Sequence, residues 1–341
     1  MVPTRQTVNI RHVAHKAGVS LGTVSRVLND HPSVTDSLRQ RVRDAIQELK
    51  YRPHAVAQSL RRGTNRMIGV VIPDLRNPFF ADLMQNIEIS ARMLGYSVLF
   101  ISSDEDATTE VQAIETLASR KVDGVIFLPS NDVHVLPRTV PLPIVVIDRP
   151  LDAHYFVGAD HRAGARMAAD YLVSLGHRRI ACISGPADSS VAQARLAGFL
   201  DVMTPHFEAA ELPMSRYVVH GDFDYVSGRE AATTLFRICT PAPTALFACS
   251  DQQAIGALRA AADHGIAVPR DLSIVGFDGI LVADLVTPRL TTVHQPVAQL
   301  ADAAITMLLE QATHAQSPIS RLFACDLVVR ESCAPPADHP C

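Results

Sequence analysis

One serine of this chain stands in a pattern that is typical of a catalytic nucleophile. Residues 18–22 read Gly-Val-Ser-Leu-Gly, which matches the Gly-x-Ser-x-Gly turn of serine hydrolases and puts Ser20 at the nucleophile position. That turn requires a buried β-strand before its first glycine and an oxyanion-binding loop from an earlier strand. The preceding residues instead carry apolar side chains at helical spacing, at Ile10, Val13, Ala14 and Ala17. We therefore reject a catalytic role for Ser20.

The residues around Ser20 predict two short helices joined by a turn. Val24, Val27 and Leu28 form the apolar stripe of the second helix, and Ser20 precedes that helix as its N-cap. Gly18 provides the turn, so the pattern is that of a helix-turn-helix. In this motif the second helix enters the major groove of DNA. A third helix, capped by Thr35 or Asp36, is predicted to close a small core with Leu38, Val42, Ile46 and Leu49.

Charge separates this head from the rest of the chain. Residues 1–66 hold 12 Lys and Arg against 4 Asp and Glu, whereas the remaining residues hold 19 against 31. A basic segment on an acidic globule indicates that only the head has a polyanionic partner.

A second group of residues with binding chemistry follows short apolar segments from residue 67 onward. These segments alternate with helical patterns in two sets, roughly 67–160 and 161–291, and they read MIGVVIP, SVLFIS, GVIFLP, IVVID, RIACISG, ALFACS and SIVGF. Near-continuous apolar strands alternating with helices predict two doubly wound lobes with parallel sheets. Neither GxGxxG nor GxxxxGK[ST] follows any of these strands, so we expect no nucleotide cofactor.

Ligands of doubly wound sheets bind at the carboxyl ends of the strands. The side chains found there suit a sugar, since amides, carboxylates and guanidiniums exchange hydrogen bonds with hydroxyls and aromatic rings stack on an apolar sugar face. The candidates are Asn77, Phe79, Phe80, Asp148, Arg149, Arg195, Phe223, Ser250, Asp278 and Gln295. Some have structural alternatives: the rings could belong to the core, and Ser250 with Gln253 could be a capping box.

The head resembles the LacI family of bacterial transcription regulators in the stretches HVAHKAGVSLGTVSRVLN and VTDSLRQRVRDAIQELKYRPHAVAQSLRR. The resemblance continues through IGVVIPDLRNPFF, KVDGVIF, GHRRIACISGP, RLAGF, PTALFACSDQQAIGAL, VPRDLSIVGFDG and PRLTTVHQP, and so covers nearly the whole chain. It implies an all-α helix-turn-helix head on a two-lobed α/β body like the periplasmic sugar-binding proteins. The effector candidates match ligand-contact positions of this family, although Ser250 stands where relatives often carry Asn.

The resemblance also implies how the chain is divided. We expect a helix-turn-helix head at 7–52, a hinge helix and linker at 53–66, a first lobe at 67–160 plus 293–320, and a second lobe at 161–292 plus 321–334. DNA is expected to contact Ser20, Leu21, Gly22, Thr23, Ser25, Arg26 and Asn29 of the head and Ala57 and Leu60 of the hinge. The hinge helices of a dimer would pair in the minor groove, with Leu60 wedged into the central base step. The alternative is that Leu60 only docks on the body.

The remaining composition agrees with a regulator. No apolar run fits a signal peptide or a membrane span, which favours a cytoplasmic protein without a membrane partner. The six cysteines form no CxxC pair, and His12 with His15 has no evident third ligand, so we expect no metal and no cofactor.

The sequence therefore predicts a DNA-binding transcription regulator that acts as a homodimer on a pseudo-palindromic operator. We expect a repressor that a small sugar-like effector, a monosaccharide or close derivative, releases from the operator. A purine or another metabolite is the alternative effector. A sugar-binding transport protein would explain only the body, and an enzyme would need an activated nucleophile, a metal site or a cofactor loop that the sequence does not offer.

Overall fold

The structure is a computed structural model that describes residues 8–28, 31–51, 65–131, 142–152, 154–311 and 317–337. The chain forms two compact units, residues 1–65 and residues 66–341. We call them the head and the body and describe each by itself.

The head contains three helices around a small apolar core, α1 (Ile10–Ala17), α2 (Leu21–Leu28) and α3 (Asp36–Glu48). Asn9 begins α1, because its side chain accepts hydrogen bonds from the amides of Arg11 and His12. Gly18 ends the helix in the left-handed conformation, with φ 61°, which glycine adopts without strain. Val13, Val24 and Val42, one from each helix, are fully buried. The predicted helix-turn-helix and third helix are thus confirmed.

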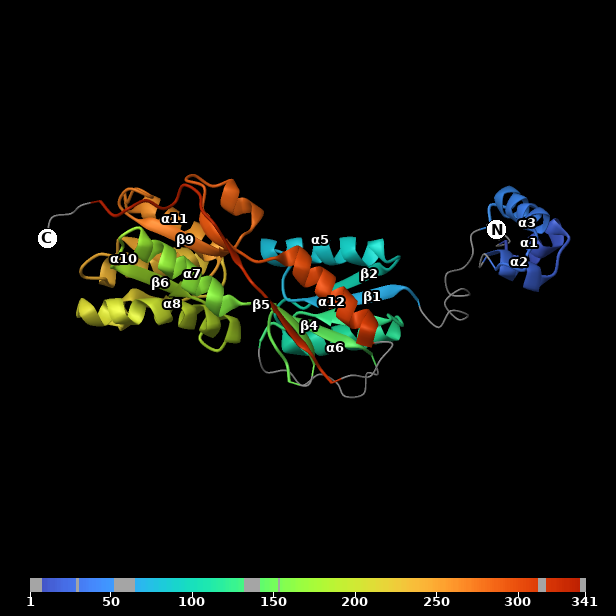
Figure 1. Cartoon of the computed structure of the whole chain (residues 1–341), viewed down its shortest axis with the longest axis horizontal. Coiled ribbons are helices and arrows are strands. Elements are labelled where there is room, and N and C mark those ends of the chain that lie inside the picture. Colours follow the sequence, from blue (N-terminus) through green and yellow to red (C-terminus); the bar gives the residue numbers. More distant parts are fainter. Residues whose placement is uncertain are drawn as a thin grey trace, which may run out of the picture. The chain divides into compact units, whose positions relative to one another are not determined.

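The first lobe of the body is built on a six-stranded sheet in the order β11-β5-β4-β3-β1-β2. The strands are β1 (Met67–Ile72), β2 (Ser97–Ser102), β3 (Gly124–Phe127), β4 (Ile144–Ile147), β5 (Tyr155–Ala159) and β11 (Ser320–Phe323), and all of their pairings are parallel. One face packs on α5 (Pro78–Met93) and α12 (Val297–Gln311). The other face packs on α6 (Ala107–Ser119). Helices on both faces define a doubly wound lobe (Figure 1).

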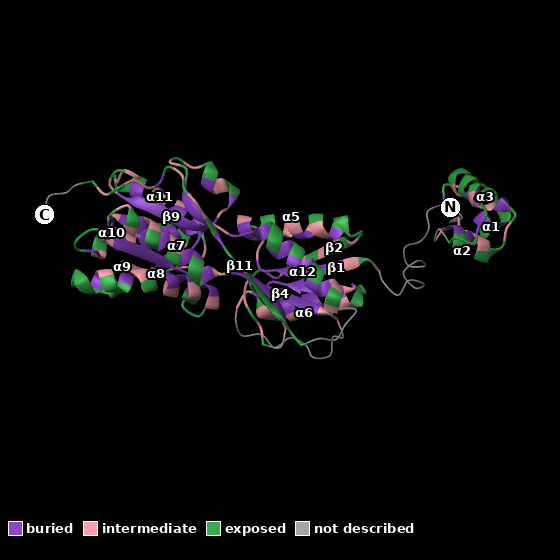
Figure 2. Ribbon diagram, viewed as in Figure 1, coloured by how far each residue is buried: buried purple, intermediate pink, exposed green. Residues whose placement is uncertain are grey.

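The second lobe repeats this plan with the strand order β12-β10-β9-β8-β6-β7. Its strands are β6 (Ile180–Ser184), β7 (Val218–His220), β8 (Ala245–Ala248), β9 (Ser273–Asp278), β10 (Thr291–His294) and β12 (Asp326–Val328). Its helices are α7 (His161–Ser174), α8 (Ser190–Ala209), α9 (Met214–Tyr217), α10 (Tyr225–Ile238), α11 (Asp251–Asp263) and the short 3-10 helix η1 (Leu281–Asp284). The central strands of both lobes are buried, and the helices have buried residues on one side and exposed residues on the other (Figure 2).

The chain crosses between the lobes three times, and the second and third crossings lie a few residues later than the predicted ranges place them. The ranges return the chain to the first lobe at residue 293, but β10, which ends at His294, pairs with β9 of the second sheet. They leave the first lobe after residue 320, but β11 pairs with β5 as far as Phe323. Each strand is completed before the chain leaves, because its backbone groups need the ladder. We predicted parallel sheets, but the last strand, β12, runs antiparallel to β10, so the second sheet is mixed.

Candidate effector pocket and DNA-reading helix

Ser20 caps the second helix of the head. Its Oγ accepts a hydrogen bond from the backbone amide of Thr23 at 3.1 Å and lies 3.0 Å from Oγ1 of the same residue. This geometry satisfies an amide at the start of α2, as the sequence predicts, and occupies the hydroxyl that a nucleophile would need.

The surface of α2 presents the predicted DNA-reading side chains to different degrees. Leu21, Gly22 and Arg26 are exposed, with 44% of the Leu21 surface accessible, whereas Thr23 and Ser25 are half-buried. Gly22 has no side chain to offer, and an added Cβ would meet only Oγ of Ser20 at 3.6 Å.

Three of the predicted DNA contacts lie outside the described residues. Asn29 follows α2, and Ala57 and Leu60 belong to the predicted hinge, which falls mainly in residues 52–64. Their roles therefore stay predictions from the sequence.

Arg41 holds the turn between α1 and α2, a role that the sequence analysis missed. Its guanidinium, carried by α3, donates to the carbonyl of Ala17 at 2.6 Å and to that of Gly18 at 3.4 Å. These carbonyls belong to the end of α1, where backbone acceptors lack partners within the helix. Arg41 thereby ties the third helix to the turn that orients α2.

In the body, one cavity brings together side chains from both lobes. Its volume is about 50 Å³, and it opens into a wider cavity of about 540 Å³ with which it shares Asn77, Glu105, Ser130, Arg149 and Phe223. Eight of the ten predicted effector contacts line the smaller cavity: Asn77, Phe79, Phe80, Asp148, Arg149, Arg195, Phe223 and Asp278. The strand ends of the two lobes thus meet in one pocket.

The aromatic rings of the pocket have different surroundings. Phe79 is buried and belongs to the core, and its ring meets that of Phe80 edge to face at a centroid distance of 5.4 Å. Phe80 and Phe223 are half-buried. Asn77 uses its side-chain oxygen to cap α5 through the amide of Phe79, at 3.0 Å. Phe79 therefore serves the core as well as the pocket, while Phe80 and Phe223 keep ring surface for a ligand.

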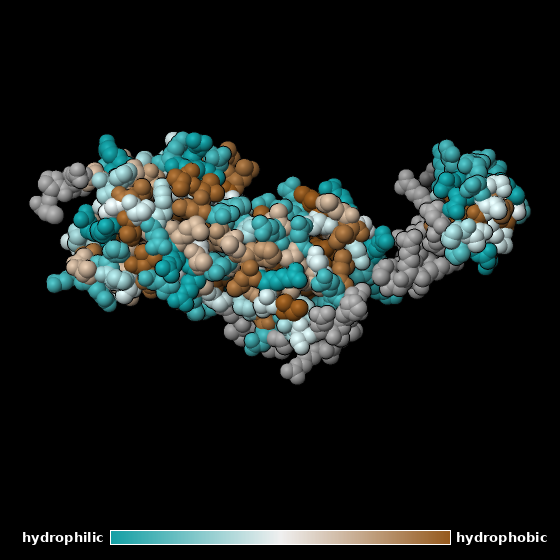
Figure 3. All heavy atoms as spheres, in the orientation of Figure 1, coloured by the Kyte–Doolittle hydropathy of each residue, from teal (hydrophilic) through white to brown (hydrophobic). Residues whose placement is uncertain are grey.

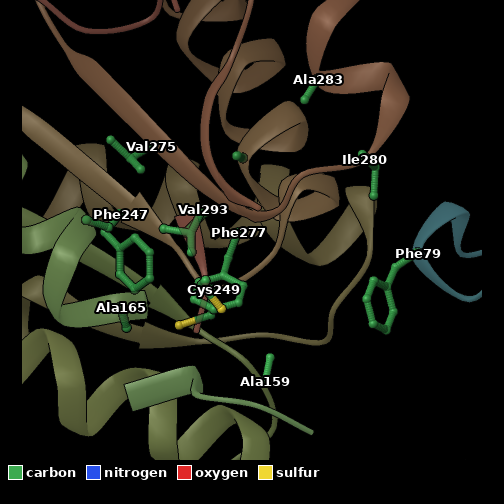
Figure 4. Packing of buried hydrophobic residues seen from close by; sticks show 14 of the residues in the cluster. Phe79, Ala159, Ala165, Phe247, Cys249, Val275, Phe277, Ile280, Ala283 and Val293 are labelled. Carbon is green, nitrogen blue, oxygen red and sulfur yellow. The ribbon is translucent and has the colours of Figure 1, made fainter. Parts of the chain in front are cut away.

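Asp278 forms a buried ion pair with Arg195 of α8. Nη1 of Arg195 lies 3.1 Å from Oδ1 of Asp278, and Nε2 of Gln295 donates to the same oxygen at 2.9 Å. Burial raises the pKa of Asp278 to about 6, and Arg195 and Gln295 limit the rise. The guanidinium also lies over the ring of Phe277, 3.9 Å from the centroid. Phe277 belongs to the buried cluster that contains Cys249 and Val293 (Figure 4).

Asp148 is paired with a residue that the sequence analysis did not single out. Nε2 of His161 lies 3.2 Å from its Oδ1, and both side chains are largely buried. Burial opposes ionisation of Asp148, but the close approach of His161 and the positive charges of Arg195 and Arg149 hold its pKa below the usual value. His161 directly follows the end of β5 and Asp160, so the strand-end criterion that selected Asp148 could also have selected it.

Two predicted contacts lie behind the pocket rather than in its lining. Ser250 is buried and caps α11, accepting from the amide of Gln253 at 3.1 Å. The reciprocal half of the capping box is not formed, because Nε2 of Gln253 donates instead to the carbonyls of Ser184 and Asp222. Gln295 is fully buried and touches Asp278. Both residues support the lining, and neither faces the cavity directly.

Several lining residues escaped the sequence analysis. The smaller cavity also includes Pro73, Glu105, Ser130 and Val191, and the wider one adds Asp74, Arg76, Asp188, Asp222 and Asp224. Most of these lie in loops whose approach to the pocket depends on the packing of the two lobes.

Metal and membrane features are absent from the described part of the chain. Within the ranges that the structure describes, no cluster of three or more His, Cys, Asp or Glu side chains is arranged to hold a metal ion. Among the same residues, no helix combines the length and apolar character needed to cross a bilayer.

The head and the body each match a known protein family. Residues 9–54 match the family described as "Bacterial regulatory proteins, lacI family", and residues 169–333 match the "Periplasmic binding protein-like domain". The ribose operon repressor of Halalkalibacterium halodurans is 38% identical over 307 residues, which cover 89% of each chain.

Two solved structures share the fold. A lac repressor dimer bound to operator and the anti-inducer ONPF superimposes with a TM-score of 0.83 at 27% identity, covering 96% of this chain and all of the other. A periplasmic binding protein/LacI transcriptional regulator from Alkaliphilus metalliredigens QYMF, complexed with D-xylulofuranose, superimposes with a TM-score of 0.68 at 27% identity, covering 79% of this chain and 99% of the other.

Proposed function

The chain belongs to the LacI family of bacterial regulatory proteins, and on that premise we propose that it is a repressor released from its operator by an uncharged monosaccharide. It is a DNA-binding regulator that responds to a small molecule, and it is not an enzyme. One observation carries the choice of effector: carboxylates, guanidiniums and aromatic rings from both lobes meet in a single pocket.

The charges around the pocket favour an uncharged ligand. In the lining of the small cavity, Arg195 is already paired with Asp278, and the carboxylate of Asp148 lies against the imidazole of His161. The guanidinium of Arg149 donates to the carbonyl of Ser130. These groups can still exchange hydrogen bonds with hydroxyls at modest electrostatic cost, whereas an anionic ligand would need an unpaired cation in the pocket.

The rim argues specifically against a phosphorylated sugar. The two cavities together are lined by the carboxylates of Asp74, Glu105, Asp148, Asp188, Asp222, Asp224 and Asp278, against the guanidiniums of Arg76, Arg149 and Arg195. Arg76 is itself paired with Asp74, with Nε 3.0 Å from Oδ1. Proteins commonly bind phosphate groups through unpaired cationic side chains or helix N-termini. The excess of negative charge here therefore disfavours a phosphate group.

The relatives support a pentose-like effector. One similar protein is named for the ribose operon, and one similar structure holds D-xylulofuranose. A purine could stack between Phe80 and Phe223, so it belongs in the test as the alternative ligand.

For the DNA side, we propose that α2 reads the major groove through Leu21 and Arg26, with Ser20, Gly22, Thr23, Ser25 and Asn29 beside them. The exposed faces of Leu21 and Arg26 support this assignment. For the hinge, the family resemblance supports a minor-groove contact by Ala57 and Leu60. We propose a cytoplasmic location, which action on bacterial DNA supports.

We further propose a homodimer on a pseudo-palindromic operator, and a similar solved structure, a lac repressor dimer bound to operator, supports the dimer. The second lobe offers a surface for such pairing at η1, where Leu281 and Leu285 are exposed by 77% and 70%. Figure 3 shows apolar side chains gathered on this lobe. Apolar patches of this kind on a soluble protein commonly mark protein interfaces.

Effector binding can release DNA only if it favours one arrangement of the lobes over another. A pocket lined from both lobes meets that condition, because a ligand touching both stabilises the closed arrangement. Closure would shift the start of β1, where the body continues from the hinge.

Calorimetry on the full-length protein tests the effector assignment with D-ribose, D-xylulose, D-glucose, D-ribose 5-phosphate and hypoxanthine. We expect binding of at least one uncharged sugar and none of the phosphorylated one, and the sugar that binds should weaken a gel shift on the DNA flanking the gene. A phosphorylated sugar or hypoxanthine as the only binder would contradict the proposal.

A further inference from the structure

His161 touches a pocket carboxylate from one lobe and a pocket guanidinium from the other. It is the first residue of α7, just beyond the strand β5 that ends the first pass through the first lobe. Its Nε2 lies 3.2 Å from Oδ1 of Asp148, which follows β4 of the first lobe. Its Nδ1 lies 3.3 Å from Nε of Arg195, on α8 of the second lobe. The imidazole therefore bridges the two lobes through residues that both line the pocket.

The contact with Arg195 determines the tautomer of the ring. A guanidinium nitrogen is always a donor, so Nε–H of Arg195 donates to Nδ1 of His161, and Nδ1 must carry a lone pair. The single ring proton then resides on Nε2 and faces the carboxylate of Asp148. A doubly protonated ring would instead set one N–H group against another at Arg195. The observed geometry thus requires a neutral imidazole.

The surroundings of His161 hold it neutral. Burial and the charge of Arg195 lower its pKa, while Asp148 and Asp160, the N-cap residue of α7, act in the opposite direction. Asp278 lies beyond Arg195 as its ion-pair partner, and the thiol of Cys325 approaches the carbonyl of Asp160 at 3.9 Å. The ring of Phe277 covers the imidazole at a centroid distance of 5.9 Å.

We propose that His161 is a positioning residue of the effector pocket: as a neutral ring it fixes Asp148 and Arg195 relative to each other across the lobe boundary. This inference rests on the proposed function, since a sugar that touches both lobes needs both groups in place at once. Protonation of the ring breaks the contact with Arg195 and with it the shared geometry of the pocket. The affinity for the effector therefore decreases as the pH is lowered, although His161 itself is not part of the lining.

Two substitutions separate the two contacts of the ring. In His161→Asn, the shorter amide can still accept from Arg195 but does not reach Asp148. In His161→Gln, the longer amide can donate to Asp148 but cannot serve both partners as the ring does. His264→Asn is the matched control, because His264 is an exposed histidine at the end of α11 in the same body.

The test combines ¹⁵N NMR of histidine-labelled full-length protein with calorimetry for D-ribose and D-xylulose between about pH 8 and pH 5. For His161 we expect the neutral tautomer with the proton on Nε2, retained to a pH below the ordinary histidine pKa of 6.5. Both His161 variants should bind sugar about tenfold more weakly than the wild type at pH 8, a difference of about 1.4 kcal/mol. The wild-type affinity should fall toward pH 5, and the variants should show a weaker dependence, of which the remainder belongs to Asp278 with its pKa of about 6.

Different results would contradict the role of His161 and the assignment of a sugar as the effector. A proton on Nδ1, or unchanged affinity and pH dependence in both His161 variants, overturns the role of His161. If neither these sugars nor any other uncharged sugar binds to the wild type, the effector assignment fails instead, and the tautomer alone decides the role of His161. If thermal unfolding shows that a variant does not fold while the control does, the tautomer and the pH dependence of sugar affinity in the wild type still test the role of His161.

Discussion

Asp148 and Asp278 both have a positive φ at the ends of strands in different lobes. Asp148 follows β4 with φ 74°, and Asp278 ends β9 with φ 117°. Residues other than glycine rarely adopt positive φ, and Asp and Asn are among those that tolerate it best. Such conformations concentrate at ligand sites, where the surrounding structure maintains them. Since both carboxylates line the pocket, the two lobes contribute equivalent acceptors by the same local means.

Replacing Asp278 by Asn should weaken effector binding while preserving the strand end. Asn has nearly the same size and shape as Asp, so the backbone should persist, but the carboxylate charge that balances Arg195 is lost. Hydrogen bonds to charged groups contribute about 1.5–3 kcal/mol, so we expect sugar affinity to fall by about 10- to 150-fold in calorimetry. Asp170→Asn, on the exposed surface of α7, is the control and should leave affinity unchanged. Equal affinity of Asp278→Asn and wild type would remove Asp278 from the effector site.

The strand-end criterion found most of the pocket, because the carboxyl ends of parallel strands must converge in a doubly wound fold. It could not distinguish residues that line the cavity from residues that lie behind the lining. Ser250 and Gln295 also follow strands, but the packing of α11 and the position of Asp278 place them one layer deeper, and a single sequence carries no signal for that depth. The residue His161 was missed for a related reason: its role depends on Arg195, which is 34 residues away along the chain.

The exact boundaries of the two lobes also could not be predicted from the sequence. Periodicity located the two sets of strands, but short strands such as β11 and β12 have little pattern of their own. They are defined by pairing with β5 and β10, and those partners are distant in sequence.

Arg26 should carry direct base specificity. It is exposed on the last turn of α2, and a bidentate contact with a guanine is the commonest specific contact of arginine. In a binding assay with single-base variants of the operator, Arg26→Ala should cost about 1–3 kcal/mol and flatten the preference at one base pair. Arg11→Ala, an exposed arginine on α1, serves as the comparison. A loss that is uniform across sequences and reduces the salt dependence would make Arg26 a phosphate contact instead.

Gly18→Ala should destabilise the head by more than backbone strain alone. The residue has φ 61°, and an added Cβ would lie 2.9 Å from Nη2 of Arg41, which holds the carbonyl of Ala17. Left-handed backbone costs about 1–2 kcal/mol for a residue with a Cβ, and loss of the Arg41 contact adds about 0.5–1.5 kcal/mol.

The comparison for Gly18 is Gly265→Ala, since Gly265 has φ 69° but open space around it. It should show the strain alone, in the unfolding of the body. Amide hydrogen exchange at the α1–α2 turn reports the loss of the Arg41 contact directly. Unchanged exchange in Gly18→Ala would show that Arg41 does not hold the turn.

Leu285→Glu should weaken the proposed dimer. The side chain is 70% exposed next to Leu281 and would place a charge in an apolar interface. Burying an unpaired charge is costly, so sedimentation equilibrium should show a shift toward monomer by at least about tenfold in the dissociation constant. Met214→Glu, an exposed apolar residue on α9, is the matched control. A dimer that resists Leu285→Glu and Leu281→Glu would place the interface on another surface.

The stability of the body should depend on pH through His161, in a direction that its pKa determines. Burial and Arg195 lower this pKa below the ordinary 6.5, so as the pH falls the unfolded state binds the proton first. The stability associated with the neutral ring is thus complete above about pH 7 and is lost as the pH falls through the folded-state value, with a slope of up to about 1.4 kcal/mol per pH unit.

Asp278 acts in the opposite sense over part of this range, because its pKa is raised to about 6 and its protonation stabilises the folded state as the pH falls. The effect of His161 is therefore isolated by comparing the wild type with His161→Phe, in which Asp278 and His177 still titrate. Urea unfolding of both proteins between about pH 8 and pH 5 should give a difference in the free energy of unfolding that is constant above pH 7 and shifts against the wild type below it. A difference that stays constant over the whole range, or that shifts in favour of the wild type at low pH, would mean that His161 is not held neutral in the folded protein.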